Sequence, residues 1–160
     1  MTPLAELAAA LGAERDAFVK FLELLRNEEA ALAEGRIDDL PAIAQAKTET
    51  FIALSRLAEC RDALLARLGV GGEAKAVDAW LERNASQPEA EGARTAWRQL
   101  LEAARQAKSL NEANGAMIEV KMQHNQQALA VLRAAARQMT LYGPDGQHLA
   151  VGGGRRYDKV

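Results

Sequence analysis

Apolar side chains recur at seven-residue intervals near the start of the chain, and this spacing constrains the fold more than any other feature. A seven-residue repeat places side chains on one stripe of an α-helix, whereas a half-buried strand needs strict alternation. We therefore expect a long amphipathic helix that buries this stripe against other helices. The stripe consists of Leu4, Leu11, Phe18, Leu25 and Leu32, widened by Leu7, Phe21 and Leu22.

The stretch "EGRIDD" predicts a turn into a second helix. Gly35 is expected to cap the first helix, and Asp38 or Asp39 to accept free N–H groups of the next, with Pro41 in its first turn. The second helix should run to about Leu68, where "GVGG" ends it. Because the connection is short, the pair should be antiparallel. The apolar residues of the second helix are Leu40, Ile43, Leu54, Leu57, Leu64 and Leu65.

Residues 73–84 predict a short helix with Trp80 and Leu81 as its apolar contacts, and a last helix should begin near residues 89–91. Its heptad rows keep their phase through the Asn114-Gly115 pair, which is otherwise a turn signal, and no strand alternation flanks that pair. We expect one helix of about 50 residues, with a break at Gly115 as the alternative. The rows read Trp97, Ala104, Asn111, Ile118, Asn125, Leu132 and Met139, and Leu101, Lys108, Gly115, Met122, Leu129 and Ala136.

The predicted fold is all-α, an elongated antiparallel helical bundle with a long C-terminal helix and a flexible tail. Abundant Ala and Leu and only 4% aromatic residues favour helix throughout. The pattern stops after Met139, where "TLYGPDGQHLAVGGGRRYDKV" contains a turn and a triple glycine. We expect a bundle domain at residues 1–139 and a tail at residues 140–160.

Composition and motifs argue against several classes of function. The 20 Lys and Arg residues are interleaved with 22 Asp and Glu, so no basic patch for nucleic acid stands out. Glu6 and the lack of a basic start argue against a signal peptide or membrane insertion, which predicts a cytoplasmic protein. No phosphate loop, metal-ligand spacing or paired nucleophile and base is present, which predicts no enzyme activity and no cofactor. Cys60 is expected to be a buried free thiol, and the acidic residues to lie mainly on exposed faces.

The last helix carries more apolar surface than a domain of this size can bury against itself. Two interpretations stay open for the apolar run near its end. It is ordinary core, covered by the first two helices or by a second subunit, or it is a surface for a partner protein. The run consists of Leu129, Val131, Leu132, Ala135, Ala136, Met139 and Leu141.

Three motifs occur together in roughly the last third of the chain: an Asn-x-x-Asn-Gly stretch, an Asn about ten residues later, and a Tyr-Gly-x-x-Gly-Gln turn. Their residues are Asn111, Asn114, Gly115, Asn125, Tyr142, Gly143, Gly146 and Gln147. In these motifs the chain resembles the FlgN family of flagellar export chaperones. The first hundred residues agree with that family only in forming an amphipathic helical hairpin of suitable length.

The resemblance implies a cytoplasmic, non-enzymatic chaperone of flagellar type III export that needs no cofactor. Its implied partners are the export apparatus and the C-terminal helices of the hook–filament junction proteins FlgK and FlgL. A structural coiled-coil protein that forms a homo-oligomer through the same stripe, without a client, is the alternative. The partner-binding residues that follow from the resemblance and the apolar run are Met122, Leu129, Leu132, Ala136, Met139, Leu141 and Tyr142.

The asparagines and the glycine of the last helix admit two explanations. A buried Asn on a helical seam lowers stability but fixes the register, so Asn111 and Asn125 are expected to lock the last helix against its neighbours. Gly115 would let a neighbouring helix approach closely. Alternatively, exposed amides would bond to the backbone of a partner.

Overall fold

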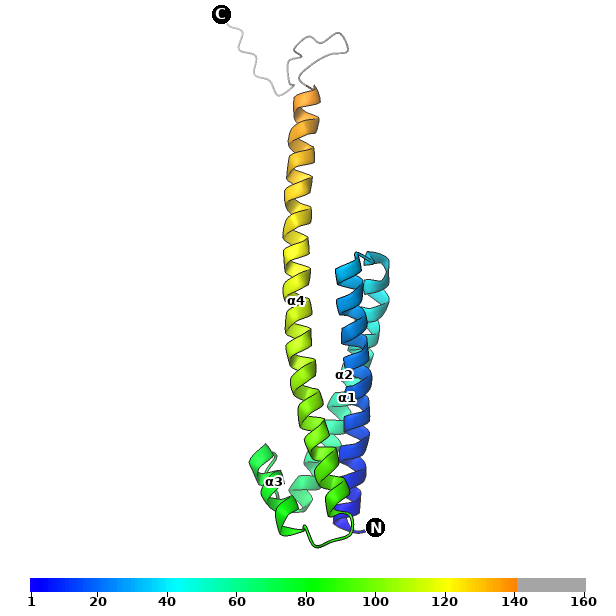
Figure 1. The fold of residues 1–160 in the computed structure, drawn as a ribbon, viewed down its shortest axis with the longest axis vertical. Coiled ribbons are helices and arrows are strands. Elements are labelled where there is room, and N and C mark those ends of the chain that lie inside the picture. The colour runs from blue at the N-terminus through cyan, green and yellow to red at the C-terminus, as the bar shows by residue number, and fades with distance from the viewer. Residues whose placement is uncertain (141–160) are drawn as a thin grey trace, which may run out of the picture. The chain divides into compact units, whose positions relative to one another are not determined.

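The structure is a computed structural model that describes residues 1–140, with side chains described up to residue 138. Within this part the chain forms four α-helices, as Figure 1 shows: α1 (Pro3–Glu34), α2 (Leu40–Arg67), α3 (Ala74–Arg83) and α4 (Ala90–Thr140). A short 3₁₀ turn, η1 (Ile37–Asp39), joins α1 to α2, and these two helices run antiparallel side by side. The all-α prediction with a long C-terminal helix is confirmed. The predicted tail lies outside the described residues, apart from Thr140 at the end of α4.

Contacts within the chain define two compact units, Met1–Ala116 and Met117–Val160, and of the second unit residues 117–140 are described. The boundary falls inside α4. This helix nevertheless contains 51 residues without interruption, so the predicted continuity through Asn114 and Gly115 is confirmed. None of the described helices is long and apolar enough to cross a membrane.

The helix ends follow the predicted turn signals with one exception. Gly35 adopts the left-handed conformation, with φ of 71°, and its N–H bonds to carbonyl groups of the last turn of α1. Asp39 is the N-cap of α2, but its carboxylate makes no capping bond and accepts a hydrogen bond from Arg36 instead. The prediction that an aspartate side chain caps α2 is therefore wrong. A nearby guanidinium is a stronger partner for a carboxylate than a backbone N–H.

The larger core cluster lies in the first unit and joins all four helices. Val77 and Leu81 are the buried residues of α3, whereas Trp80, a predicted contact, is only partly buried against the cluster. A smaller cluster joins Leu22 and Leu25 of α1 to two alanines of α4. The larger cluster includes Leu4, Leu7, Leu11, Leu65, Val77, Leu81, Ala93, Ala96, Trp97 and Leu100.

The buried face of α4 differs from the predicted heptad rows. Its small residues face the core, while Lys108 and Asn111 of the predicted rows are exposed at the edge. Alanines permit close approach of helices, and they outnumber the larger apolar side chains on the buried face. The predicted heptad rows follow the larger apolar residues of α4, and they lie beside the stripe that is buried in the structure. The buried residues are Ala90, Ala93, Ala96, Trp97, Leu100, Ala103, Ala107 and Asn114.

Cys60 is exposed on α2, so the expectation of a buried thiol is wrong. The buried residues of α2 are Leu54 and Leu65. Leu54 lies six residues before Cys60 and Leu65 five residues after it, so neither shares a face of the helix with the thiol. The position of the thiol therefore follows from which face of α2 packs against α1, and not from the apolar character of cysteine.

Candidate partner-binding site

The segment at residues 118–138 of α4 is exposed along its whole described length. Its large apolar side chains keep between 37% and 67% of their surface accessible to solvent. Of the predicted partner-binding residues, four lie on this segment and are exposed: Met122, Leu129, Leu132 and Ala136. The side chain of Met139 and residues Leu141 and Tyr142 lie outside the described part, as do Gly143, Gly146 and Gln147.

The exposed apolar residues form a stripe because of their spacing. Positions separated by three, four or seven residues lie on one side of a helix. The stripe also carries the amide of Asn125, which is exposed. Val120 and Val131 are also exposed, but they lie on another side of the helix. The stripe consists of Ile118, Met122, Asn125, Leu129, Leu132 and Ala136.

The other amides of the motif lie in the first unit and contact different helices. Lys47 of α2 donates a hydrogen bond of 2.9 Å to Oδ1 of Asn111. Asn114 is fully buried, and its Nδ2 donates to the carbonyl oxygen of Leu25 in α1 at 2.9 Å. The Oδ1 atom of Asn114 has no hydrogen-bond partner among the described residues. Asn111 and Asn114 thus connect α4 to α2 and to α1.

Gly115 follows these amides but makes no close approach to a neighbour. A Cβ atom built at this position would meet no atom within 4 Å. Within the part of the chain that the structure describes, no helix uses the space beside Gly115. The expected close approach of a neighbouring helix of the same chain is therefore not found.

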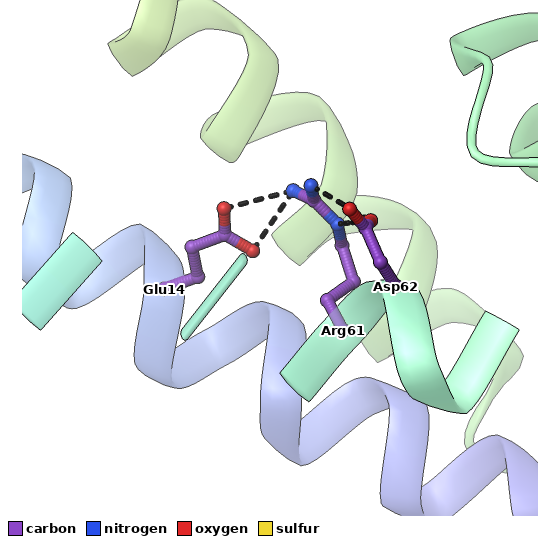
Figure 2. Close-up of polar contacts among 3 residues, drawn as sticks. All are labelled: Glu14, Arg61 and Asp62. Atoms are coloured by element: carbon purple, nitrogen blue, oxygen red, sulfur yellow. Dashed lines mark hydrogen bonds and ion pairs between the residues drawn. The ribbon is translucent and has the colours of Figure 1, made fainter. Parts of the chain in front are cut away.

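Two buried acidic residues of α1 pair with basic residues of α2. Nη1 of Arg61 donates to both carboxylate oxygens of Glu14, at 2.8 and 2.9 Å, and the same guanidinium also bonds to Asp62, as Figure 2 shows. Nζ of Lys47 lies 2.7 Å from Oε2 of Glu28. Burial raises the pKa of the Glu14 carboxyl above its usual value, although Arg61 opposes this shift.

The prediction that the acidic residues lie mainly on exposed faces is wrong for Glu14 and Glu28. The sequence did contain a signal that these two residues are buried, because both fall in the seven-residue row of α1 that also contains Leu7 and Phe21. Glu28 follows Glu14 by two heptads, and Lys47 precedes Arg61 by two heptads. Both pairs therefore fit a single antiparallel alignment of α1 with α2. A slipped alignment would leave buried charges without partners.

Comparison with known proteins identifies the family. The family model described as "FlgN protein" matches residues 1–150. The flagella synthesis protein FlgN of Salmonella typhimurium is 34% identical over 94 residues, which cover 59% of this chain and 64% of that protein. The chain thus spans slightly less than two thirds of that relative. The flagella synthesis protein FlgN of Yersinia enterocolitica is 28% identical over 138 residues, covering 85% of this chain and 84% of that protein.

A solved structure shares the fold. It is the crystal structure of a Pseudomonas aeruginosa protein that is also described as a flagella synthesis protein FlgN. Its TM-score with this chain is 0.62, and the sequence identity is 19%. The similarity covers 74% of this chain and 88% of that one. At this identity the likeness concerns the fold alone. The match of the family model to nearly the whole sequence shows that this chain belongs to the FlgN family, a family of non-enzymatic flagellar export chaperones.

Proposed function

We propose that this chain is a cytoplasmic chaperone that holds the C-terminal helices of the hook–filament junction proteins FlgK and FlgL before the export apparatus secretes them. The observation that supports this most is the exposure of the apolar stripe on residues 118–138. The proposed contact residues are the four exposed ones, Met122, Leu129, Leu132 and Ala136, together with Met139, Leu141 and Tyr142.

The chemistry of the stripe suits an amphipathic helix as its ligand. Soluble proteins rarely leave large contiguous apolar patches uncovered unless the patch binds something. Anchors that repeat with helical spacing match those of a second helix laid alongside. Met122 adds a flexible, polarisable side chain, which suits a surface that adapts to two related clients. Asn125 would offer its amide to polar groups of the client helix.

The same exposed stripe also supports a second candidate, a structural coiled coil in which two copies of the chain pair without a client. The two functions predict different responses to a client peptide. If the stripe serves clients, an excess of a FlgK C-terminal peptide should shift any oligomer to a one-to-one complex in light scattering. If the stripe is structural, the oligomer should persist unchanged.

A titration with a FlgK C-terminal peptide tests the proposed contact. Leu129→Ala and Leu132→Ala should each weaken binding by ~1–3 kcal/mol, the usual effect of truncating an apolar anchor. Leu132 is already 64% exposed, so its truncation should leave the free energy of unfolding nearly unchanged. Val131→Ala is the matched control, because Val131 is 67% exposed on another side of the same segment. Equal affinities for the Leu132→Ala and Val131→Ala variants would overturn the assignment of the stripe.

A further inference from the structure

A second candidate binding surface lies wholly within the first unit. It is a groove with a volume of about 360 Å³, lined by residues of α1, α2 and α4. None of its lining residues belongs to the segment at residues 118–138. The groove is therefore separate from the stripe to which the proposed function assigns the client.

The groove extends along about two turns of each helix that lines it. Its lining residues come from positions 14–21 of α1, 51–58 of α2 and 104–111 of α4. Each of these stretches spans one heptad, which corresponds to two helical turns or about 10 Å. A further helix lying along the groove would present three apolar side chains to it, at i, i+3 or i+4, and i+7.

Aromatic side chains line the groove on the α1 and α2 sides, and small side chains line it on the α4 side. Phe18 and Phe21 of α1 and Phe51 of α2 contribute phenyl rings, while Ala104 and Ala107 contribute only methyl groups from α4. Phe51 keeps 62% of its surface exposed. The small α4 side leaves room for bulky side chains from outside, and the exposed ring gives such side chains an apolar surface to cover.

The charges at the groove indicate the character of the occupant. Two ionised side chains line it, Glu14 and Lys108. Glu14 is already paired with Arg61. Lys108 is exposed and, among the residues that the structure describes, has no ion-pair partner. An occupant that complements this groove must therefore combine apolar side chains with a negative charge.

We propose that this groove binds an amphipathic α-helix of a second partner protein, which carries apolar side chains at i, i+4 and i+7 and an acidic side chain against Lys108. Such a helix would complete a four-helix arrangement with α1, α2 and α4. Its contacts are separate from the stripe, so one chain would hold a client and this second helical partner at different surfaces.

Two synthetic helical peptides test the proposal with the full-length chain. Both carry leucines at i, i+4 and i+7, and they differ only in having glutamates or lysines beside the leucines. In fluorescence anisotropy the acidic peptide should bind more tightly. Phe51→Ala should raise its Kd about tenfold or more, as expected for loss of an aromatic anchor. Lys108→Glu should reverse the preference between the two peptides.

Matched variants make the test specific. Ile52→Ala changes the next residue of α2, which is 48% exposed and does not line the groove, and should leave the Kd unchanged. Lys20→Glu makes the same charge change on α1, outside the groove, and should also leave the preference unchanged. Ala104→Leu should block binding by filling the groove from the α4 side. The measurement on the Ala104→Leu variant does not depend on how well the Phe51→Ala variant folds.

Two outcomes would overturn the proposal. One is peptide binding that Leu132→Ala abolishes and Phe51→Ala leaves intact, because the peptide would then occupy the stripe and not the groove. The other is a dimer of the free chain that Phe51→Ala dissociates, which would identify a second copy as the occupant. A failure of FlgK binding to the stripe would count against the proposed function but not against the groove proposal, so the two proposals are tested independently.

Discussion

Arg61→Ala removes the partner of a buried carboxylate, and its effect on stability should depend strongly on pH. Only 2% of Glu14 is exposed, and Arg61 supplies both hydrogen bonds that the structure gives its carboxylate. Breaking a buried pair by removing one partner typically costs ~3–5 kcal/mol, because the remaining charge stays buried without compensation. We expect a loss of this size in the free energy of unfolding near neutral pH.

The sign of the pH dependence follows from the pKa of Glu14. Burial raises this pKa above 4.5 in the folded chain, and the charge of Asp62 adds to the rise, while Arg61 lowers it through its charge and its hydrogen bonds. A raised carboxyl pKa favours folding below the unfolded value, and this contribution is lost as the pH rises through the folded value. Without Arg61 the folded pKa should rise further. The variant should therefore lose most stability near neutral pH and least below about 4.5.

Urea-induced unfolding followed by circular dichroism at neutral and acidic pH measures both quantities. Arg67→Ala is the matched control on the same helix, because its contact with Glu6 is 3.4 Å long and Arg67 is 70% exposed. That exposed pair should contribute only ~0–1 kcal/mol. If Arg61→Ala lost the same free energy at both pH values, or no more than Arg67→Ala, the argument from a buried unpaired charge would be refuted.

Three further predictions concern α4. Gly115→Ala should raise the free energy of unfolding by up to ~1 kcal/mol, since alanine favours helix and the site has open space, and a loss in urea unfolding would contradict this. Trp97→Phe removes the 2.8 Å hydrogen bond from Nε1 to Asp78 and should lower the free energy of unfolding by ~0.5–1.5 kcal/mol in thermal unfolding. An unchanged free energy of unfolding would show that this bond does not stabilise the fold. In light scattering the free chain should self-associate as its concentration rises, and Leu132→Asp should weaken this self-association. A chain that stays monomeric at every concentration would argue against association through the apolar stripe.

The course of the helices could be predicted from the sequence because local signals determine it. The seven-residue row of α1, the left-handed Gly35 and the unbroken phase of α4 each act within a few residues. The buried face of α4 depends on tertiary contacts instead. An alanine-rich helix offers more than one apolar stripe, and packing against α1 selects the one that contains Ala103 and Ala107. No local signal distinguishes that stripe from its neighbour.

The binding surfaces could be predicted to different degrees. The apolar run near the end of α4 was recognisable as a candidate surface, and the structure shows its described residues exposed. The groove beside Phe51 was not recognisable, because it requires three helices to meet at one level. The same limit applies to Glu14. Its position in an apolar row is visible in the sequence, but its partner Arg61 is identified only once the alignment of α1 with α2 is known.

The amides of α4 illustrate how such polar contacts specify one packing. Lys47 contacts both Glu28 and Asn111, so one ammonium group connects α1, α2 and α4. Asn114 adds a bond to Leu25 about one turn further along α4. A slip of α4 by one residue would move these amides by 1.5 Å and rotate them by about 100°, which breaks both contacts. Apolar contacts among alanines would tolerate such a slip far better. We therefore expect Asn111 and Asn114 to select the register. The buried Asn114 should also lower stability, because its Oδ1 has no hydrogen-bond partner among the described residues.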